Sequence, residues 1–299
     1  MCPAMVSSNS SRWTFPPSVA DCSAMSDAEI TPIVPREGWH VMHLFYHVDH
    51  AQWSLYGDDE KRQAKTRLTE LVQEIRATPD THLLVFSVTT PKADLGFMLL
   101  GPDLQMLNAF EKQISLSLGP EILSPAYSYL SQTEGSEYTT TREQYSAETL
   151  IGEKGMTEGS AEFEAALVEF DERMAHYLKH RLYPVLPGWP VICFYPMSKR
   201  RSGEDNWYSL SYEERRKLMA GHARVGRKYS GKILQLITGS TGLDEFEWGV
   251  TLLAKDTFDI KAIVYEMRFD EVSARYAEFG DFYIGLQLPL DVLFRRICL

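Results

Sequence analysis

Histidine side chains gather in two parts of the sequence where an imidazole nitrogen could bind a metal ion. The first group is His40, His43, His47 and His50, within a segment of aromatic and β-branched residues that is typical of a strand. Because successive side chains of a strand point to opposite faces, these four histidines divide into two pairs on opposite faces. A shared metal site would need a bend, so we expect ordinary strand histidines here.

His222 lies in a segment with helical spacing. Leu218 and Met219 precede it by four and three residues and Arg215 by seven, so they form one stripe of a helix predicted over 211–228. We expect this stripe to face a sheet, where a neutral imidazole among apolar neighbours can coordinate a metal. The alternative is a core histidine without a ligand.

Positive charge is concentrated around this histidine. The chain has a formal net charge of −11, which argues against nucleic acid as a partner. Residues 195–232, however, hold ten Lys and Arg against four Asp and Glu. Such a basic island would suit an anionic ligand. A solvated helix face with ion pairs is the alternative.

Several common site motifs are missing from the sequence. None of the four cysteines lies at CxxC spacing, so neither a zinc site nor a redox motif is indicated, and a reducing compartment fits best. The glycine-rich stretches 135–136 and 239–242 do not lead from a strand into a helix as a phosphate site requires. GxSxG, HExxH and EF-hand patterns do not occur, so hydrolase, metalloprotease and calcium functions have no support.

The elements that must position these residues occur twice in the order β-α-β-β-α-β. In the first half we predict strands over 39–48, 82–89, 96–101 and 127–132, and helices over 58–78 and 103–118. In the second half we predict strands over 191–196, 233–238, 248–254 and 282–288, and helices over 211–228 and 257–276. The fold class is α+β: two ferredoxin-like units, of the dimeric α+β barrel type, with sheets packed face to face.

This pattern divides the chain into four parts. They are a Ser-, Pro- and Ala-rich tail with little structure (1–35), an N-terminal domain (36–150), a helical connector (151–187) and a C-terminal domain (188–299). No apolar run approaches the roughly 20 residues of a membrane-spanning helix. The start of the chain lacks the features of a signal peptide. We therefore expect a cytoplasmic protein.

Several segments of the second half resemble the chlorite dismutase superfamily, and within it the coproheme decarboxylases. They are 195–201 (YPMSKRR), 206–208 (NWY), 213–229 with His222, 237–250 with ITGS and EWGV, and 265–276 (YEMRFDEVSARY). The first half is similar mainly in the order of its elements, and residues 1–35 lie outside the resemblance.

The resemblance implies a role for seven residues. His222 would be the axial ligand of a porphyrin iron, and Tyr195 the catalytic tyrosine that becomes a radical beside a propionate. Gln235 would lie above the iron, on the side where peroxide reacts. The residues that would hold the propionates are Arg181, Met197, Lys199 and Ser273, together with Tyr195.

The implied function is hydrogen-peroxide-dependent oxidative decarboxylation of Fe-coproporphyrin III (coproheme) to haem b through a three-propionate intermediate. The substrate is then its own redox cofactor. Four propionates need cations and hydroxyl groups, which the basic island supplies. The resemblance also implies a homopentamer and a transient contact with a ferrochelatase.

Two other functions stay open. Chlorite dismutases resemble one another in a distal arginine, whereas Gln235 is neutral, so we expect weak chlorite conversion and a likeness to the Gram-positive type of decarboxylase. A haem-binding or haem-sensing protein without turnover is an alternative of another class.

Each residue role also has a purely structural alternative. Tyr195 could pack beneath a helix, and Ser273 could cap a helical turn. Met197 could fill space in the core. Lys199 could end a charged strand, and Arg181 could form a surface ion pair.

Overall fold

The structure, a computed structural model, describes residues 31–299. Of the predicted tail at 1–35, residues 1–30 lie outside the described residues. Residues 32–299 form one compact unit, and the domain boundaries at 150 and 188 stay a prediction. No helix within 31–299 is both long and apolar enough to cross a membrane.

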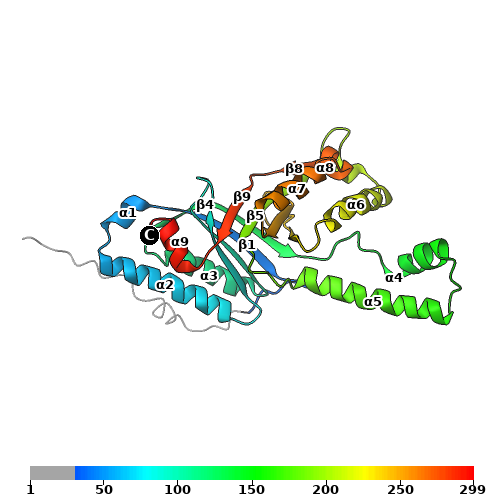
Figure 1. Ribbon diagram of the computed structural model, residues 1–299, viewed down its shortest axis with the longest axis horizontal. Helices are drawn as coiled ribbons and strands as arrows, with labels where there is room; N and C mark the ends of the chain where they lie inside the picture. Colours follow the sequence, from blue (N-terminus) through cyan, green and yellow to red (C-terminus); the bar gives the residue numbers. More distant parts are fainter. Residues whose placement is uncertain (1–30) are drawn as a thin grey trace, which may run out of the picture. The chain divides into compact units, whose positions relative to one another are not determined.

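The first half of the described chain contains four strands with helices against them (Figure 1). The strands are β1 (His40–Val48), β2 (His82–Val88), β3 (Leu95–Gly101) and β4 (Leu123–Thr133). The helices are α1 (His50–Leu55), α2 (Asp58–Ala77) and α3 (Leu104–Leu116). All elements but α1 were predicted, and β4 begins four residues earlier than its pattern indicated.

A helical arm connects the halves. It consists of α4 (Arg142–Gln144), the π-helix η2 (Tyr145–Glu153) and α5 (Ala161–Leu182). We predicted only α5 from the sequence.

The second half repeats the element order with additions. Its strands are β5 (Val191–Lys199), β6 (Ile233–Gly239), β7 (Trp248–Ala254), β8 (Ala277–Phe279) and β9 (Tyr283–Gln287). Its helices are η3 (Trp207–Ser209), α6 (Tyr212–Arg227), α7 (Thr257–Met267), α8 (Glu271–Tyr276) and α9 (Leu290–Arg296). The segment 257–276 is mostly helical, as predicted, but it contains two helices, because Asp270 caps a separate helix, α8, with its side chain.

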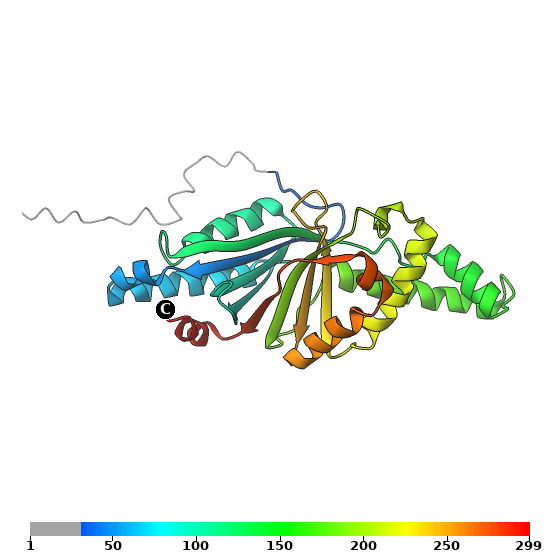
Figure 2. The same ribbon diagram turned by 90° about the horizontal axis from the view of Figure 1, so that it is seen from above.

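All strands belong to one antiparallel sheet. Their order is β7-β6-β4-β1-β3-β2-β9-β5-β8, and β5 also pairs with β7, so the sheet closes on itself with β8 beside β5. The halves join at two seams, β2 with β9 and β4 with β6. The α+β fold of two repeated units is therefore confirmed, and the two sheets are continuous at both edges (Figure 2).

Aromatic side chains from both halves fill the space inside this closed sheet. Phe45 from β1 lies 5.8 Å from Phe194 of β5 between ring centroids, and His43 stacks on Phe194 at 4.0 Å. His43 is fully buried, and Nε2 is 2.8 Å from the Thr251 hydroxyl. Burial lowers the pKa of His43 to about 3, so the ring is neutral. It is thus a core histidine, and residues 31–299 contain no group of three metal-ligating side chains.

Outside the sheet, each half packs against its own helices. The predicted apolar positions of α2, among them Leu68 and Ile75, are buried against the first-half strands. In the second half, Val191, Cys193 and Tyr195 alternate along β5 and pack with Ile260 and Ile263 of α7. This outer face of the second half carries four of the predicted site residues: Tyr195, Met197, Lys199 and Gln235.

Candidate functional site

Three of the predicted site residues share one face of β5. Tyr195, Met197 and Lys199 alternate along the strand and therefore point to the same side. The Tyr195 side chain is buried, and its ring stacks on Phe282, the residue before β9, with 4.3 Å between centroids. Burial raises the pKa of Tyr195, although the charge of Arg268 opposes the shift. Tyr195 is thus a neutral phenol at physiological pH.

Gln235 of β6 faces the same side as Ile233 and Ile237, which pack in the cluster that contains Tyr195. A Cβ added to Gly226 of α6 would lie 3.2 Å from Nε2 of Gln235, so this amide lies against the helix. Gly226 follows His222 by four residues and lies on the same side of α6. Gln235 therefore lies against α6 one helical turn from His222.

His222 has a defined orientation. Its Nδ1 is 2.8 Å from Oδ2 of Asp270, and its side chain is 21% exposed. Because an ionised carboxylate only accepts hydrogen bonds, Nδ1 carries the proton and Nε2 keeps a free lone pair. Although burial acts in the opposite direction, the hydrogen bond from His222 keeps the pKa of Asp270 below its ordinary value. His222 is therefore oriented so that the lone pair of Nε2 can bind a metal ion.

The stripe around His222 differs from the prediction. Leu218 and Met219 pack against a cluster of Trp207, Val272 and Tyr276. The apolar neighbours of the stripe therefore come from η3 and α8. From the sequence, we predicted that the stripe faces the sheet. The helix itself begins as its sequence indicates, with a capping box that joins Ser211 and Glu214.

Lys199 and Ser273 converge on Asp270. The Lys199 side chain is 7% exposed, and its ammonium group lies 4.9 Å from the ring centroid of Trp207. Burial lowers the pKa of Lys199 to about 8, while the charges of Asp270 and Glu247 act in the opposite direction. The backbone N–H of Ser273 donates to Oδ2 of Asp270 at 3.4 Å. The His222 imidazole and the backbone N–H of Ser273 thus donate to one carboxylate, whose charge also acts on the buried Lys199 ammonium group.

Arg181 lies apart from this group. Its Nε donates to the carbonyl oxygen of Glu134 at 2.7 Å, beyond the end of β4. Among the side-chain hydrogen bonds and ion pairs of residues 31–299, none joins Arg181 to the other six predicted residues. Its role at a propionate stays a prediction.

Sequence reasoning missed Asp270 and Arg268. Asp270 could have been noticed as a helix cap, since Asp270 and Ser273 have the spacing of an N-terminal capping pair. Arg268 lies with its guanidinium carbon 3.9 Å from the ring centroid of Phe279. Asp270 and Arg268 both belong to the segment 265–276 that carries the resemblance, but no role was predicted for either of them from the sequence.

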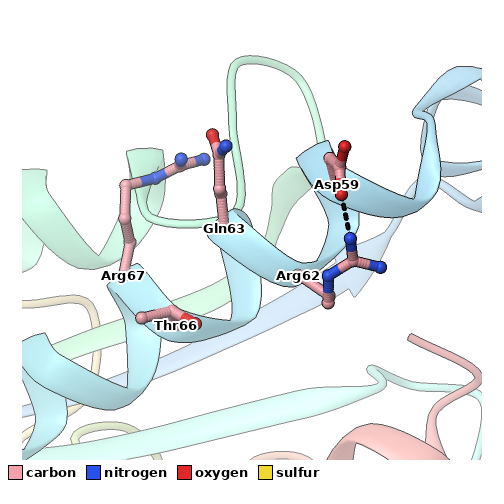
Figure 3. A pocket seen from close by; sticks show the side chains of 5 residues that line it. All are labelled: Asp59, Arg62, Gln63, Thr66 and Arg67. Carbon is pink, nitrogen blue, oxygen red and sulfur yellow. Dashed lines mark hydrogen bonds and ion pairs between the residues drawn. The ribbon is translucent and has the colours of Figure 1, made fainter.

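Two of the surface hollows formed by residues 31–299 differ in their position relative to the site. One, of about 510 Å³, lies on α2 and contains none of the predicted residues; Arg62 there forms an ion pair with Asp59 (Figure 3). The other, of about 620 Å³, lies along α7 and includes Arg268 and Phe282. Because Phe282 stacks on Tyr195, only the second hollow adjoins the candidate site.

The residues of this site suit an iron porphyrin. His222 offers a free imidazole nitrogen, and the apolar side chains of Met197, Ile237 and Phe282 pack against the cluster that contains Tyr195. Lys199 offers a buried positive charge for a carboxylate. Imidazole ligation, apolar walls and a cation near the edge are the features that a porphyrin with propionates requires.

Comparison with known proteins agrees with this geometry. The family model described as chlorite dismutase matches residues 61–288. The chain belongs to the chlorite dismutase family. The family assignment made from the sequence is thus confirmed.

Solved structures extend the comparison. The chain is 37% identical to a structure described as a novel heme-binding protein from Thermus thermophilus, covering 90% of this chain and 99% of that one with a TM-score of 0.73. It is 18% identical to a mutant chlorite dismutase from Candidatus Nitrospira defluvii, covering 89% and 98% with a TM-score of 0.65. The same enzyme in complex with imidazole is 17% identical, covering 89% and 97% with a TM-score of 0.64. The likeness to the two chlorite dismutase structures concerns the fold alone.

Proposed function

We propose that this member of the chlorite dismutase family binds coproheme through His222 and decarboxylates it to haem b at the expense of hydrogen peroxide. One observation carries the proposal. The hydrogen bond between His222 and Asp270 leaves Nε2 free for a metal ion, one helical turn from the point where Gln235 lies against α6. Tyr195 and Lys199 lie on the same face of the sheet as Gln235.

The bound ferric porphyrin would react with hydrogen peroxide and supply the oxidising equivalents. Tyr195 would then give up its phenolic hydrogen and take a hydrogen atom from the β-carbon of a propionate. Loss of one further electron and of carbon dioxide leaves a vinyl group. Each propionate thus loses two electrons, and one peroxide is reduced to two water molecules.

The other residues would bind and orient the substrate. Lys199 would hold a propionate by charge, and Ser273 and Arg181 would donate hydrogen bonds to the carboxylates. Gln235 would offer a neutral amide on the peroxide side. Because an amide attracts the chlorite anion less than an arginine does, chlorite conversion should be weak.

A loading experiment tests this function. The protein is mixed with ferric coproheme without oxygen, and peroxide is then added in steps while absorbance and mass are followed. We expect the stepwise loss of two carboxyl groups and an intermediate with three propionates. Bleaching or an unchanged porphyrin would instead indicate a haem carrier, and rapid oxygen release from chlorite would indicate a chlorite dismutase.

We further propose a homopentamer in the cytoplasm that receives coproheme from a ferrochelatase. These three points rest on the family resemblance of the sequence. Light scattering of the purified protein would test the assembly, and a coproheme transfer assay with and without a ferrochelatase would test the contact.

A further inference from the structure

The helix that carries His222 has little anchorage in the core. None of the residues of α6 is buried, whereas α2 buries five residues and α7 buries two. Since burial of apolar side chains is what usually fixes a helix, the position of α6 depends more on polar contacts at its surface.

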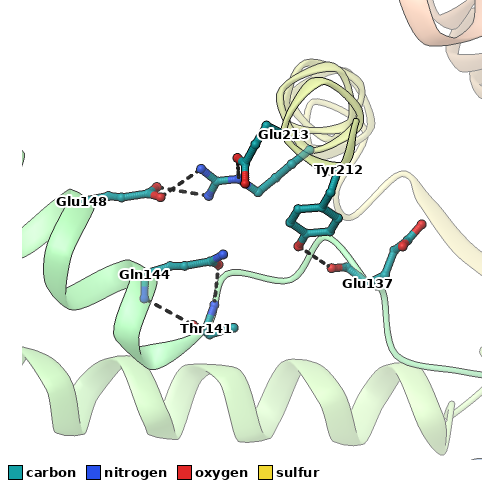
Figure 4. A network of polar contacts seen from close by, with 7 residues as sticks. Glu137, Thr141, Gln144, Glu148, Tyr212 and Glu213 are labelled. Atoms are coloured by element: carbon teal, nitrogen blue, oxygen red, sulfur yellow. Dashed lines mark hydrogen bonds and ion pairs between the residues drawn. The ribbon is translucent and has the colours of Figure 1, made fainter. Parts of the chain in front are cut away.

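The polar contacts at the N-terminal half of α6 come from the segment before α5. Arg216 donates to both carboxylate oxygens of Glu148, with distances of 3.1 and 2.9 Å. The Tyr212 hydroxyl donates to the carbonyl oxygen of Glu137 at 2.9 Å. In Figure 4, Tyr212 points from α6 towards Glu137, and the Glu148 side chain points towards α6. A bidentate pair fixes direction as well as distance.

Glu148 belongs to a segment that is packed against α5. It belongs to η2, whose Leu150 packs with Phe163 and Leu167 of α5 in a small core of their own. Tyr145 also stacks on Phe170 with 4.2 Å between ring centroids. Glu148 therefore projects from a packed hairpin rather than from a loose loop.

A hydrogen bond joins the C-terminal end of this hairpin to the sheet. The Thr133 hydroxyl at the end of β4 donates to the carbonyl oxygen of Leu182 at 2.7 Å. The hairpin of residues 142–182 thus runs from the sheet to Glu148, and Arg216 connects it to α6.

We propose that Arg216 and Glu148 are positioning residues, which hold α6 so that His222 stays at the distance from the sheet that a bound iron porphyrin requires. The part of this inference that concerns porphyrin binding rests on the proposed function. Arg216 lies six residues before His222 in the same helix, so a displacement of one moves the other.

Amide hydrogen exchange of the free protein tests the positioning directly. In Glu148→Gln, exchange of residues 218–226 should be about threefold to fivefold faster, as expected for the loss of a partly exposed bidentate pair. Arg216→Gln should give the same increase, and the double variant should add nothing further. High salt should shift the wild type towards the variants, because it screens the pair. The matched control is Asp291→Asn, which breaks the exposed ion pair with Arg295 on α9.

The second readout is the rate at which ferric coproheme leaves the protein for a scavenger such as apomyoglobin. Both single variants should release it about threefold to fivefold faster, while Asp291→Asn should match the wild type. Unchanged exchange in α6 together with unchanged release would overturn the inference. If the wild type does not bind coproheme, the proposed function fails, and the exchange measurement still decides whether the pair positions α6.

Discussion

At the scale of single residues, His222 and Asp270 illustrate how a site is built from distant parts of a chain. The two residues are 48 positions apart, and each is placed by its own helix, α6 or the start of α8. The carboxylate accepts a hydrogen bond from Nδ1 and so fixes the orientation of the ring. The charge of the same carboxylate acts on Lys199, so the proposed iron ligand and the proposed propionate-binding cation are coupled.

We predict that Asp270→Asn weakens coproheme binding by about 10-fold to 100-fold, because His222 loses its orienting carboxylate. Titration of the protein with ferric coproheme, followed by absorbance, measures the change. Asp259→Asn is the control, since Asp259 is also on this side of the molecule but pairs with Lys232. Equal affinities for all three proteins would show that the carboxylate has no such role.

Tyr195→Phe should bind coproheme like the wild type and stop at the first decarboxylation or before it. Phenylalanine keeps the stacking on Phe282 but has no phenolic hydrogen to give up. Mass spectrometry after peroxide addition measures the outcome, with Tyr265→Phe, which changes an exposed ring, as the control. Formation of haem b by Tyr195→Phe would contradict the radical role.

Lys199 should make coproheme binding depend on pH. Burial lowers its pKa to about 8, so the free protein carries this charge below pH 8 and loses it above. A bound propionate favours the charged form, and the affinity should therefore fall as pH rises through 8, by at most about tenfold per pH unit. Titrations with coproheme on both sides of pH 8 measure this fall, and in Lys199→Met it should be absent. A pH dependence that survives this substitution would assign the effect to another group.

At the scale of elements, regular periodicity was enough to predict all the main strands and α2, α3, α5 and α6. The misses have physical causes. η2 is a π-helix, whose hydrogen bonds join residues five apart, so a search for 3.6-residue periodicity does not detect it. The break between α7 and α8 contains neither proline nor glycine, and a single capping aspartate, Asp270, determines it.

The close approach of α6 to the sheet predicts different effects for two glycines of this helix. Gly221→Ala should stabilise the protein by about 0.5–1 kcal/mol, because alanine favours helix and the new Cβ meets nothing closer than 3.9 Å. Gly226→Ala should stabilise the protein by less than this. It should also slow the reaction with peroxide, since its Cβ crowds the Gln235 amide. Thermal unfolding and stopped-flow absorbance separate the two effects. Identical behaviour of the two variants would show that the Gln235 side chain can move aside without an effect on stability or on the rate of the reaction with peroxide.

At the scale of the whole molecule, the sequence indicated two similar halves but not how their edges meet. The seams pair Phe86 with Gln287 and Gln132 with Gly239, partners that are far apart in the chain and share no local pattern. The site residues were likewise found through the family resemblance. The strand predicted over 191–196 contained Tyr195 but ended before Met197 and Lys199, and nothing in its pattern related it to His222.

The seam between β2 and β9 should be sensitive to added volume. A Cβ at Gly285 would overlap the ring of Phe86, so Gly285→Ala should destabilise the protein by about 1–3 kcal/mol. Adding Phe86→Leu should recover part of this loss, because the smaller side chain makes room. Denaturant unfolding of the single and double variants measures both values. Additive losses would mean that the two residues do not compete for the same space.

The closed sheet has a consequence for attempts to divide this protein. Although the chain looks like two repeats, a cut between β4 and β5 would leave each fragment with unpaired strand edges and an uncovered aromatic surface. Such fragments should precipitate when expressed separately and regain solubility only when produced together.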